Sequence, residues 1–383
     1  MTMNEPSWDQ ARIRASQIRK PLSKESLNLS DCIGRTLAEK AISLVDLPTY
    51  ETSAMDGYAV STENGPWKIV GDVKAGEPHI GILRKGDALR IATGAVIPNG
   101  TYGILRWENA NVVNECVEGE TSFAKDFRPS GEEAKKDEVL VESGMKLSPA
   151  MIGLLAASGY DTLEVVRKPK VALLLLGDEI QHSGLPKNGL VRDSIGVQLP
   201  SWLEILGCEI VSIDNVSDSL ASTKKAILEA TRTSDIVVTT GGTADGPRDF
   251  LHTAISELAG VVHVNKVAVR PGHPQLLGEI GDTAILGLPG NPQSAIVALF
   301  TLGEPLIFSM LGRRTRELPL IFCSEILEVQ QNFTRLVLGN IVNGEFQSGR
   351  YLGSAMLRSL AHARGFAIVT NPASTVRWLE LPL

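Results

Sequence analysis

Acidic side chains follow two apolar stretches of this chain, at the points where we expect buried β-strands to end. These residues are Asp178, Glu179, Asp245 and Asp249. Carboxylate oxygens beside a phosphate site are suited to hold Mg²⁺, which prefers oxygen ligands and bridges phosphates. Asp178 and Asp249 are also suited simply to cap a helix or a turn, and the sequence leaves both interpretations open.

Two glycine-containing turns in the stretch 234–311 predict binding sites for an anion. Gly241 and Gly242 follow the apolar run 235–239, and we expect a helix to begin at Pro247, with Asp249 in its first turn. The segment Pro289-Gly290-Asn291-Pro292 follows the run 284–288, and Asn291 is placed to cap a helix that begins at Pro292. A strand, a glycine turn and a helix start together present free backbone N–H groups to an anion. Two such sites indicate a small ligand that carries phosphate.

A basic segment lies between these turns. Arg270 and His273 bracket Pro271-Gly272 and are either anion ligands or solvated surface charges. The chain contains no Gly-x-x-x-x-Gly-Lys-Ser/Thr segment, so it does not bind phosphate through a P-loop of that kind.

Alternating strands and helices must position these residues. Apolar runs at 171–176, 208–213, 235–239 and 284–288 predict buried strands. Helices are expected over 194–206, with Asp193-Ser194 as the cap, and over 220–231. This alternation over 169–311 predicts a doubly wound α/β domain. Ligands of such sheets lie at the carboxyl ends of the strands, where the acidic residues and glycine turns fall.

The remaining chain predicts three further parts. We expect residues 7–45 and 145–168 to form a helical and linker domain, with a helical stretch over 7–44 and Ser23 or Ser26 as a cap. Residues 46–144 read as a β-rich domain, and residues 312–383 as a small C-terminal β domain. Within the β-rich domain, Asp56-Gly57 suits a hairpin turn, and Thr93-Gly94 ends a strand where a hydroxyl would meet a ligand.

Composition excludes several classes of protein. The 383 residues carry 37 Lys+Arg against 44 Asp+Glu, a net charge of -7, which argues against nucleic-acid and membrane-surface binding. We expect no apolar run of the roughly 18 residues that span a membrane. The N-terminus lacks the apolar core of a signal peptide, and the four cysteines are scattered without metal-site spacing. A cytoplasmic location is therefore expected.

Six motifs, in this order and spacing, resemble those of molybdopterin molybdenumtransferases, the family that includes the gephyrin E domain. They are PTYETSAMDGYAV, RIATGAVIP, GDEI, TTGGTADGPRDF, VRPGHP and LPGNPQSA. The resemblance implies insertion of molybdate into adenylylated molybdopterin, with release of AMP and with Mg²⁺ assisting. It also implies an elongated homodimer of four domains, whose active cleft lies between the α/β domain of one subunit and the β domain of the other. Other cofactor-biosynthesis proteins or molybdoenzymes are further partners that it suggests.

The resemblance also assigns roles to individual residues. Catalytic roles fall to Asp56, Thr93, Glu133, Glu179 and Asp249, and Mg²⁺ binding to Asp178, Glu179 and Asp249. Substrate binding falls to Gly241, Gly242, Arg270, His273, Pro289, Gly290, Asn291, Pro292 and Ser294.

The chain departs from the family pattern at several of its motif positions. Glu133 stands where the family usually has aspartate, Ala244 where it has serine, and Pro247 where an acidic residue often follows. Arg270 and His273 replace two lysines. Because imidazole is charged only when protonated, we expect anion affinity here to rise as the pH falls from about 8 to 6. These departures leave a second hypothesis, in which the chain binds molybdopterin or the finished cofactor as a carrier, sensor or scaffold without efficient transfer.

Overall fold

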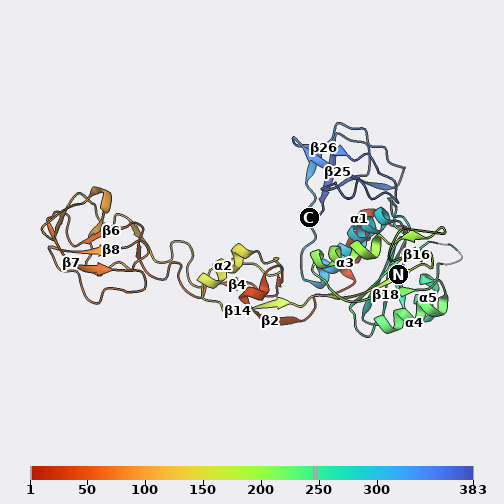
Figure 1. Cartoon of the computed structure of the whole chain (residues 1–383), viewed down its shortest axis with the longest axis horizontal. Helices are drawn as coiled ribbons and strands as arrows, with labels where there is room; N and C mark the ends of the chain where they lie inside the picture. The colour runs from red at the N-terminus through yellow and green to blue at the C-terminus, as the bar shows by residue number, and fades with distance from the viewer. Residues whose placement is uncertain (1, 245, 247–248, 383) are drawn as a thin grey trace. The chain divides into compact units, whose positions relative to one another are not determined.

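The computed structural model describes residues 2–244, 246 and 249–382 (Figure 1). The chain forms two compact units. The large unit comprises Met1–Glu25, Gly34–Ala38 and Val165–Leu383, and the small unit comprises Ser26–Ile33 and Glu39–Glu164.

A seven-stranded sheet forms the centre of the large unit. Its strands, in spatial order, are β1 (Met3–Asn4), β20 (Val261–Asn265), β22 (Leu276–Ile280), β23 (Thr283–Leu288), β19 (Ile236–Thr240), β15 (Lys170–Leu176) and β18 (Glu209–Val216). The last four of these pair in parallel, whereas β22 is antiparallel to both β20 and β23. The predicted strands are therefore all present, each within a few residues of its expected bounds.

Helices cover both faces of this sheet, which confirms the doubly wound prediction. They are α1 (Trp8–Gln17), α3 (Ile195–Leu206), α4 (Leu220–Ala230), α5 (Leu251–Glu257), α6 (Pro292–Ala298) and α7 (Glu304–Met310). Alternate residues of β15 point to opposite faces: Val171 and Leu173 pack in one core with α1, α3, α6 and α7, and Ala172 and Leu174 in another with α4 and α5. A strand buried on both faces must be apolar throughout, which explains the unbroken apolar runs of the sequence.

The register of the parallel strands brings three chain segments to one edge. Leu175 on β15 pairs with Thr240 at the end of β19, and Thr240 pairs with Leu288 at the end of β23. The loops that follow these strands therefore leave the sheet side by side.

The helix Pro292–Met310 is continuous, with a π-helical stretch, η3 (Leu299–Gly303), between α6 and α7. Among the described residues it is the one helix of 18 or more residues apolar enough to cross a membrane, so the expectation that no run reaches this length was wrong. Its most apolar stretch is 89% buried inside the protein, which is typical of the core helix of a globular domain.

A buried ion network fixes this helix to the N-terminal helix. Arg12 Nη2 lies 2.9 Å from Glu304 Oε2, Arg12 Nη1 donates to the Phe300 carbonyl in η3, and Arg316 Nε lies 2.7 Å from Glu304 Oε1. Glu304 is fully buried. Burial lowers the pKa of the Arg12 guanidinium, and the nearby Glu304 carboxylate offsets part of that effect.

A six-stranded sheet follows α7, as expected for the C-terminal part. Its strands, in order, are β21 (Val269–Arg270), β25 (Thr334–Val342), β26 (Glu345–Ser348), β24 (Leu320–Phe322), β28 (Thr375–Glu380) and β27 (Gly365–Val369). The strand β21 comes from the basic segment, so the boundary expected at residue 312 does not separate this sheet from the α/β part of the chain.

The small unit is built largely of strands, as predicted. One six-stranded sheet has the order β10 (Asn111–Val113), β11 (Cys116–Glu118), β7 (Trp67–Val73), β8 (Asp87–Ile91), β6 (Gly57–Val60) and β9 (Gly103–Arg106). Smaller pairings join β5 (Thr52–Ser53) to β12 (Phe127–Arg128) and β4 (Ala41–Ile42) to β13 (Val139–Val141), and helix α2 spans Pro149–Ala157. Because β6 pairs with β8 and β9 rather than with β5, Asp56-Gly57 is not the turn of a hairpin.

The helical prediction over 7–44 was wrong beyond its first third. Helix α1 ends at Gln17, and the following segment forms β2 (Lys24–Asn28), a short 3₁₀ turn at Leu29–Cys32, and β3 (Thr36–Leu37). The strands β2 and β3 pair with β14 (Thr162–Val166), a partner that is more than 120 residues away in sequence. This strand pairing overrides the local helix propensity of the segment. The cap of helix α1 is Ser7, not Ser23 or Ser26.

The ion network generates a stability prediction. We expect Glu304→Gln to lower the free energy of unfolding by roughly 3 kcal/mol, because it leaves the buried Arg12 guanidinium and the half-buried Arg316 guanidinium without a counter-charge. Urea unfolding followed by tryptophan fluorescence measures this, since Trp8 lies beside Arg12. The exposed Glu204→Gln is the matched control. A loss below about 1 kcal/mol in Glu304→Gln would contradict the role assigned to the network.

A second prediction concerns Asp235, which precedes β19. Arg167 Nη1 and Nη2 each donate to its carboxylate at 2.7 Å, and the Lys170 backbone N donates at 2.8 Å. Burial of Asp235 opposes its ionisation, but these hydrogen bonds outweigh that effect and hold the pKa of Asp235 below its ordinary value.

A depressed pKa stabilises the fold above the ordinary aspartate pKa of about 3.9, and that contribution is lost as the pH falls through the lower folded value. We expect Asp235→Asn to cost about 1–2 kcal/mol at pH 7 and progressively less below about pH 4. Unfolding free energies at pH 7, 5 and 3 test this, with the exposed Asp282→Asn as control. A difference from the natural protein that stays constant with pH would refute it.

Candidate functional site

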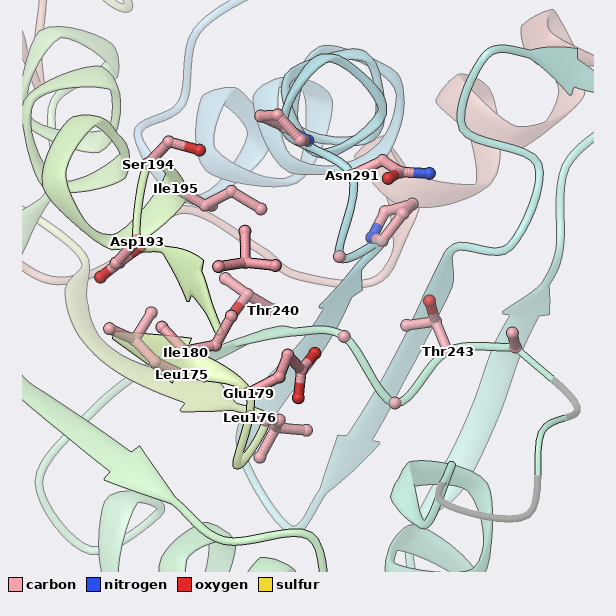
Figure 2. A pocket seen from close by; sticks show the side chains of 18 of the residues that line it. Leu175, Leu176, Glu179, Ile180, Asp193, Ser194, Ile195, Thr240, Thr243 and Asn291 are labelled. Atoms are coloured by element: carbon pink, nitrogen blue, oxygen red, sulfur yellow. The ribbon is translucent and has the colours of Figure 1, made fainter. Parts of the chain in front are cut away.

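A cavity of about 1080 Å³ lies in the large unit at the carboxyl ends of β15, β19 and β23 (Figure 2). Its wall contains the loops that follow these three strands, the start of α3, and a short piece of the C-terminal part. The predicted glycine turns and two of the predicted carboxylates therefore meet in one place.

The loop after β15 contributes Glu179. Gly177 adopts a φ of 135°, and a Cβ atom there would lie only 2.8 Å from a Glu179 carboxylate oxygen, so glycine lets this carboxylate fold back over the turn. Asp178 does not line the cavity. Its side chain instead accepts a long, 3.4 Å hydrogen bond from the backbone of Asp218, which does line the cavity.

The loop after β19 contributes Gly241, Gly242 and Asp249. Both glycines have positive φ values, 85° and 70°, which L-residues rarely adopt. Asp249 lies before α5, which begins at Leu251, so its placement in the first turn of a helix was wrong. Its carboxylate accepts a 2.7 Å hydrogen bond from Gly246 N and closes the loop. The predicted roles of Asp245 and Pro247 lie outside the described residues.

The loop after β23 leads into α6 at Pro292, as expected. Asn291 occupies the capping position, but its side chain makes no cap hydrogen bond and instead donates from Nδ2 to Ser354 Oγ at 3.3 Å. Pro289, Gly290, Asn291 and Pro292 all line the cavity. Ser294 is buried and does not line it.

Arg270 and His273 lie apart from this cavity. The Arg270 guanidinium stacks over Phe333 and lines a second pocket, of about 200 Å³, together with Arg335, its neighbour across β21 and β25. His273 packs against the same Phe333 ring, and its Nε2 lies 2.7 Å from Glu5 Oε1. A protonated His273 therefore already has a carboxylate partner.

The candidate residues of the small unit fall in two places. Asp56 Oδ1 accepts a 2.7 Å hydrogen bond from Thr93 N, so these two residues lie together on the exposed surface of that unit. Glu133 lines a separate pocket of about 370 Å³ with Arg128.

The predicted carboxylate ligands do not form a complete metal site by themselves. Across the described part of the chain, no three His, Cys, Asp or Glu side chains gather closely enough to hold a metal ion. The trio Asp178, Glu179 and Asp249 is therefore not assembled as a cage. Glu179 and Asp249 still line one cavity, and Mg²⁺ usually combines one or two carboxylates with water and substrate phosphates. These two residues fit an ion that is shared with a phosphate ligand.

Comparison with known proteins identifies the family. A model of the MoeA N-terminal region (domain I and II) matches residues 7–159, and a model of a probable molybdopterin binding domain matches residues 172–309. A relative from Haemophilus influenzae, named molybdopterin molybdenumtransferase, is 34% identical over 323 residues, which are 81% of this chain and 79% of the relative. The chain belongs to the molybdopterin molybdenumtransferase family.

Two further proteins agree with this assignment. The Bacillus subtilis molybdopterin molybdenumtransferase is 29% identical over 389 residues, 94% of this chain and 89% of its own. The structure of a molybdopterin biosynthesis moea protein from Pyrococcus horikosii superposes with a TM-score of 0.82 at 26% identity, covering 99% of both chains. The family resemblance inferred from the motifs is confirmed, and the chain is a transferase of molybdenum cofactor biosynthesis.

The cavity of this molybdenumtransferase falls mainly in the part that matches the molybdopterin-binding model. Sequence reasoning missed several of its residues. Asp193 was predicted only as a cap, and it is one, since its Oδ1 accepts from Gly196 N at 2.8 Å, but it also lines the cavity. Ser194 belongs to the same predicted cap, whereas no sequence pattern singled out Arg192, which also lines the cavity. Ala355 and Leu357 come from the C-terminal part, where no motif pointed to a site.

Proposed function

We propose that this molybdopterin molybdenumtransferase inserts molybdate into adenylylated molybdopterin and releases AMP. The observation that carries the proposal is the convergence of three strand-end loops, two of them with glycine turns, on a single cavity lined by Glu179 and Asp249. A cavity of about 1080 Å³ is of the size that small-molecule and cofactor sites have.

The turns after β19 and β23 would bind the phosphate groups of the substrate. Gly241, Gly242, Gly290 and Asn291 bring backbone to the cavity wall without bulky side chains, and α6 begins directly behind them. Because α6 continues through η3 and α7 to Met310, the N-terminus of a long helix faces this loop. Free N–H groups and the helix dipole stabilise negative charge there.

Glu179 and Asp249 would hold Mg²⁺ together with phosphate oxygens of the substrate. When bound, such an ion would neutralise negative charge on the phosphoanhydride of the substrate. The surrounding backbone fixes the orientation of both carboxylates. Gly177 permits the Glu179 side chain to fold over its turn, and the hydrogen bond from Gly246 N holds the Asp249 side chain in place. Asp178 contributes through its contact with Asp218 rather than as a ligand of the ion.

Arg270 would bind molybdate, with His273 beside it. Arg270 and Arg335 line one pocket without a carboxylate in its wall, so two fork-shaped guanidinium groups are available to an oxyanion. This arrangement favours transfer. The contact between His273 and Glu5 favours the alternative, a molybdopterin or cofactor carrier without efficient transfer, because it weakens one of the two positions where the family has lysine.

The first functional prediction separates two roles of Asp249. Asp249→Asn keeps an oxygen that accepts from Gly246 N but removes the charge, whereas Asp249→Ala removes both. If the carboxylate holds a cation, both variants should lower molybdate- and Mg²⁺-dependent AMP release by roughly 100-fold or more. If Asp249 only closes the loop, Asn should restore turnover.

AMP release from adenylylated molybdopterin measures this, and pterin binding should remain largely intact in both variants. The exposed Asp282→Asn is the matched control. Absence of AMP release from the natural protein, with binding preserved, would favour the carrier function.

The second functional prediction concerns a homodimer. Each of its active sites would take Asp56, Thr93 and Glu133 from one subunit and Asp249 from the other. Light scattering at micromolar protein should give twice the chain mass. Asp56→Ala and Asp249→Ala should each be inactive alone. In a mixed dimer, one site would carry both substitutions and the other neither, so mixing the variants should recover up to roughly a quarter of the natural activity. No recovery in a verified mixed dimer would contradict a shared site.

A further inference from the structure

The cavity is strongly acidic for a site that receives an anion. Among the described residues, four carboxylates line it, those of Glu179, Asp193, Asp218 and Asp249. Among its described lining residues, Arg192 is the single cationic side chain. Phosphate groups entering this space therefore meet repulsion that one guanidinium and a bound cation must offset.

Arg192 is held at the wall by local backbone structure. It ends the two-residue strand β17 (Val191–Arg192), which pairs in parallel with β16 (Ile180–Gln181), and Val191 N donates to Glu179 O at 2.9 Å. Its Nη1 donates to Gln181 O at 3.0 Å. Figure 2 shows the next residues, Asp193 and Ser194, on a different side of the cavity from Asn291, with Glu179 lower in the view. The strand β17, which carries Arg192, thus leads directly into the side of the cavity that lies away from Asn291.

Arg192 has no acidic partner to explain its place. Within the described part of the chain, no carboxylate oxygen lies within 4 Å of its guanidinium nitrogens, although Asp193 is its neighbour in sequence and is itself engaged with Gly196 N and His182. Arginines elsewhere in this protein, such as Arg12 and Arg167, are paired with carboxylates. One hydrogen bond to Gln181 leaves most of the five N–H donors of Arg192 unused.

We propose that Arg192 is a further substrate-binding residue, which holds a phosphate oxygen of the ligand from the part of the cavity wall that β17 forms. The inference rests on the proposed function and deepens it. The ligand class is a phosphate ester or phosphoanhydride, which the planar guanidinium recognises with two parallel hydrogen bonds. This contact forms on binding and persists through the reaction, so it contributes to affinity rather than to the chemical step.

Calorimetric titration with AMP tests the proposal on the full chain. Arg192→Gln should weaken AMP affinity by about tenfold or more, and Arg192→Lys by a few-fold, because lysine keeps the charge but not the fork. The exposed Arg232→Gln keeps the same change of net charge away from the cavity and should leave the affinity unaltered. In steady-state turnover, Arg192→Gln should raise KM for adenylylated molybdopterin with little change in kcat.

The outcomes separate the two proposals. Equal AMP affinity and equal KM in the natural protein and Arg192→Gln overturn the role of Arg192 and leave the proposed function standing. AMP binding that depends on Arg192, without molybdate-dependent AMP release, overturns the reaction and retains the binding residue. Failure of the natural protein to bind AMP overturns both. If Arg192→Gln does not fold, Arg192→Lys with an unchanged Tm decides: natural affinity in that variant overturns the proposal.

Discussion

The parallel register of β15, β19 and β23 is the constraint on which the site depends. Because Leu175, Thr240 and Leu288 are cross-strand neighbours, three loops that are far apart in sequence must leave the sheet at one edge. Asp235, between Arg167 and the backbone of Lys170, ties the opposite end of the same strands. The loops carry the chemistry, but the strand pairing decides that Glu179, Gly241 and Asn291 face one cavity.

The helix that begins at the turn Pro289–Pro292 is secured by charge as well as by packing. The continuous helix Pro292–Met310 is buried among apolar side chains, yet Glu304 lies inside it at a position that water does not reach. Two arginines, Arg12 from α1 and Arg316 from the chain after α7, satisfy that carboxylate, so the N-terminal helix and the segment that follows α7 are both held to the helix. An ion network of this kind contributes little net stability compared with apolar packing, but it penalises any arrangement in which one partner is missing.

Local sequence patterns predicted those parts of the molecule whose cause is local. The apolar runs of β15, β19 and β23, the Asp193 cap and the start of α6 at Pro292 each follow from a few adjacent residues, and all are present. The helix expected over 7–44 failed because β2 and β3 pair with β14, which local patterns do not reveal. Contacts between distant segments could not be predicted for the same reason. The residues around Ser354 do not indicate that it accepts a hydrogen bond from the Asn291 side chain, and those around Arg335 do not indicate that it shares a pocket with Arg270.

The charge of the cavity and the position of the arginines belong to one physical problem. In the proposed function, a substrate that carries phosphate would be bound by a wall in which four of the described side chains are carboxylates, in a protein of net charge -7. Carboxylates alone would repel it, and arginines alone would leave no place for a divalent ion. The structure separates these requirements in space: Glu179 and Asp249 lie at the strand ends, Arg192 is anchored on β17, and Arg270 and Arg335 form a smaller pocket of their own. Keeping the guanidinium groups out of ion pairs with these carboxylates leaves both sets of charges available to ligands.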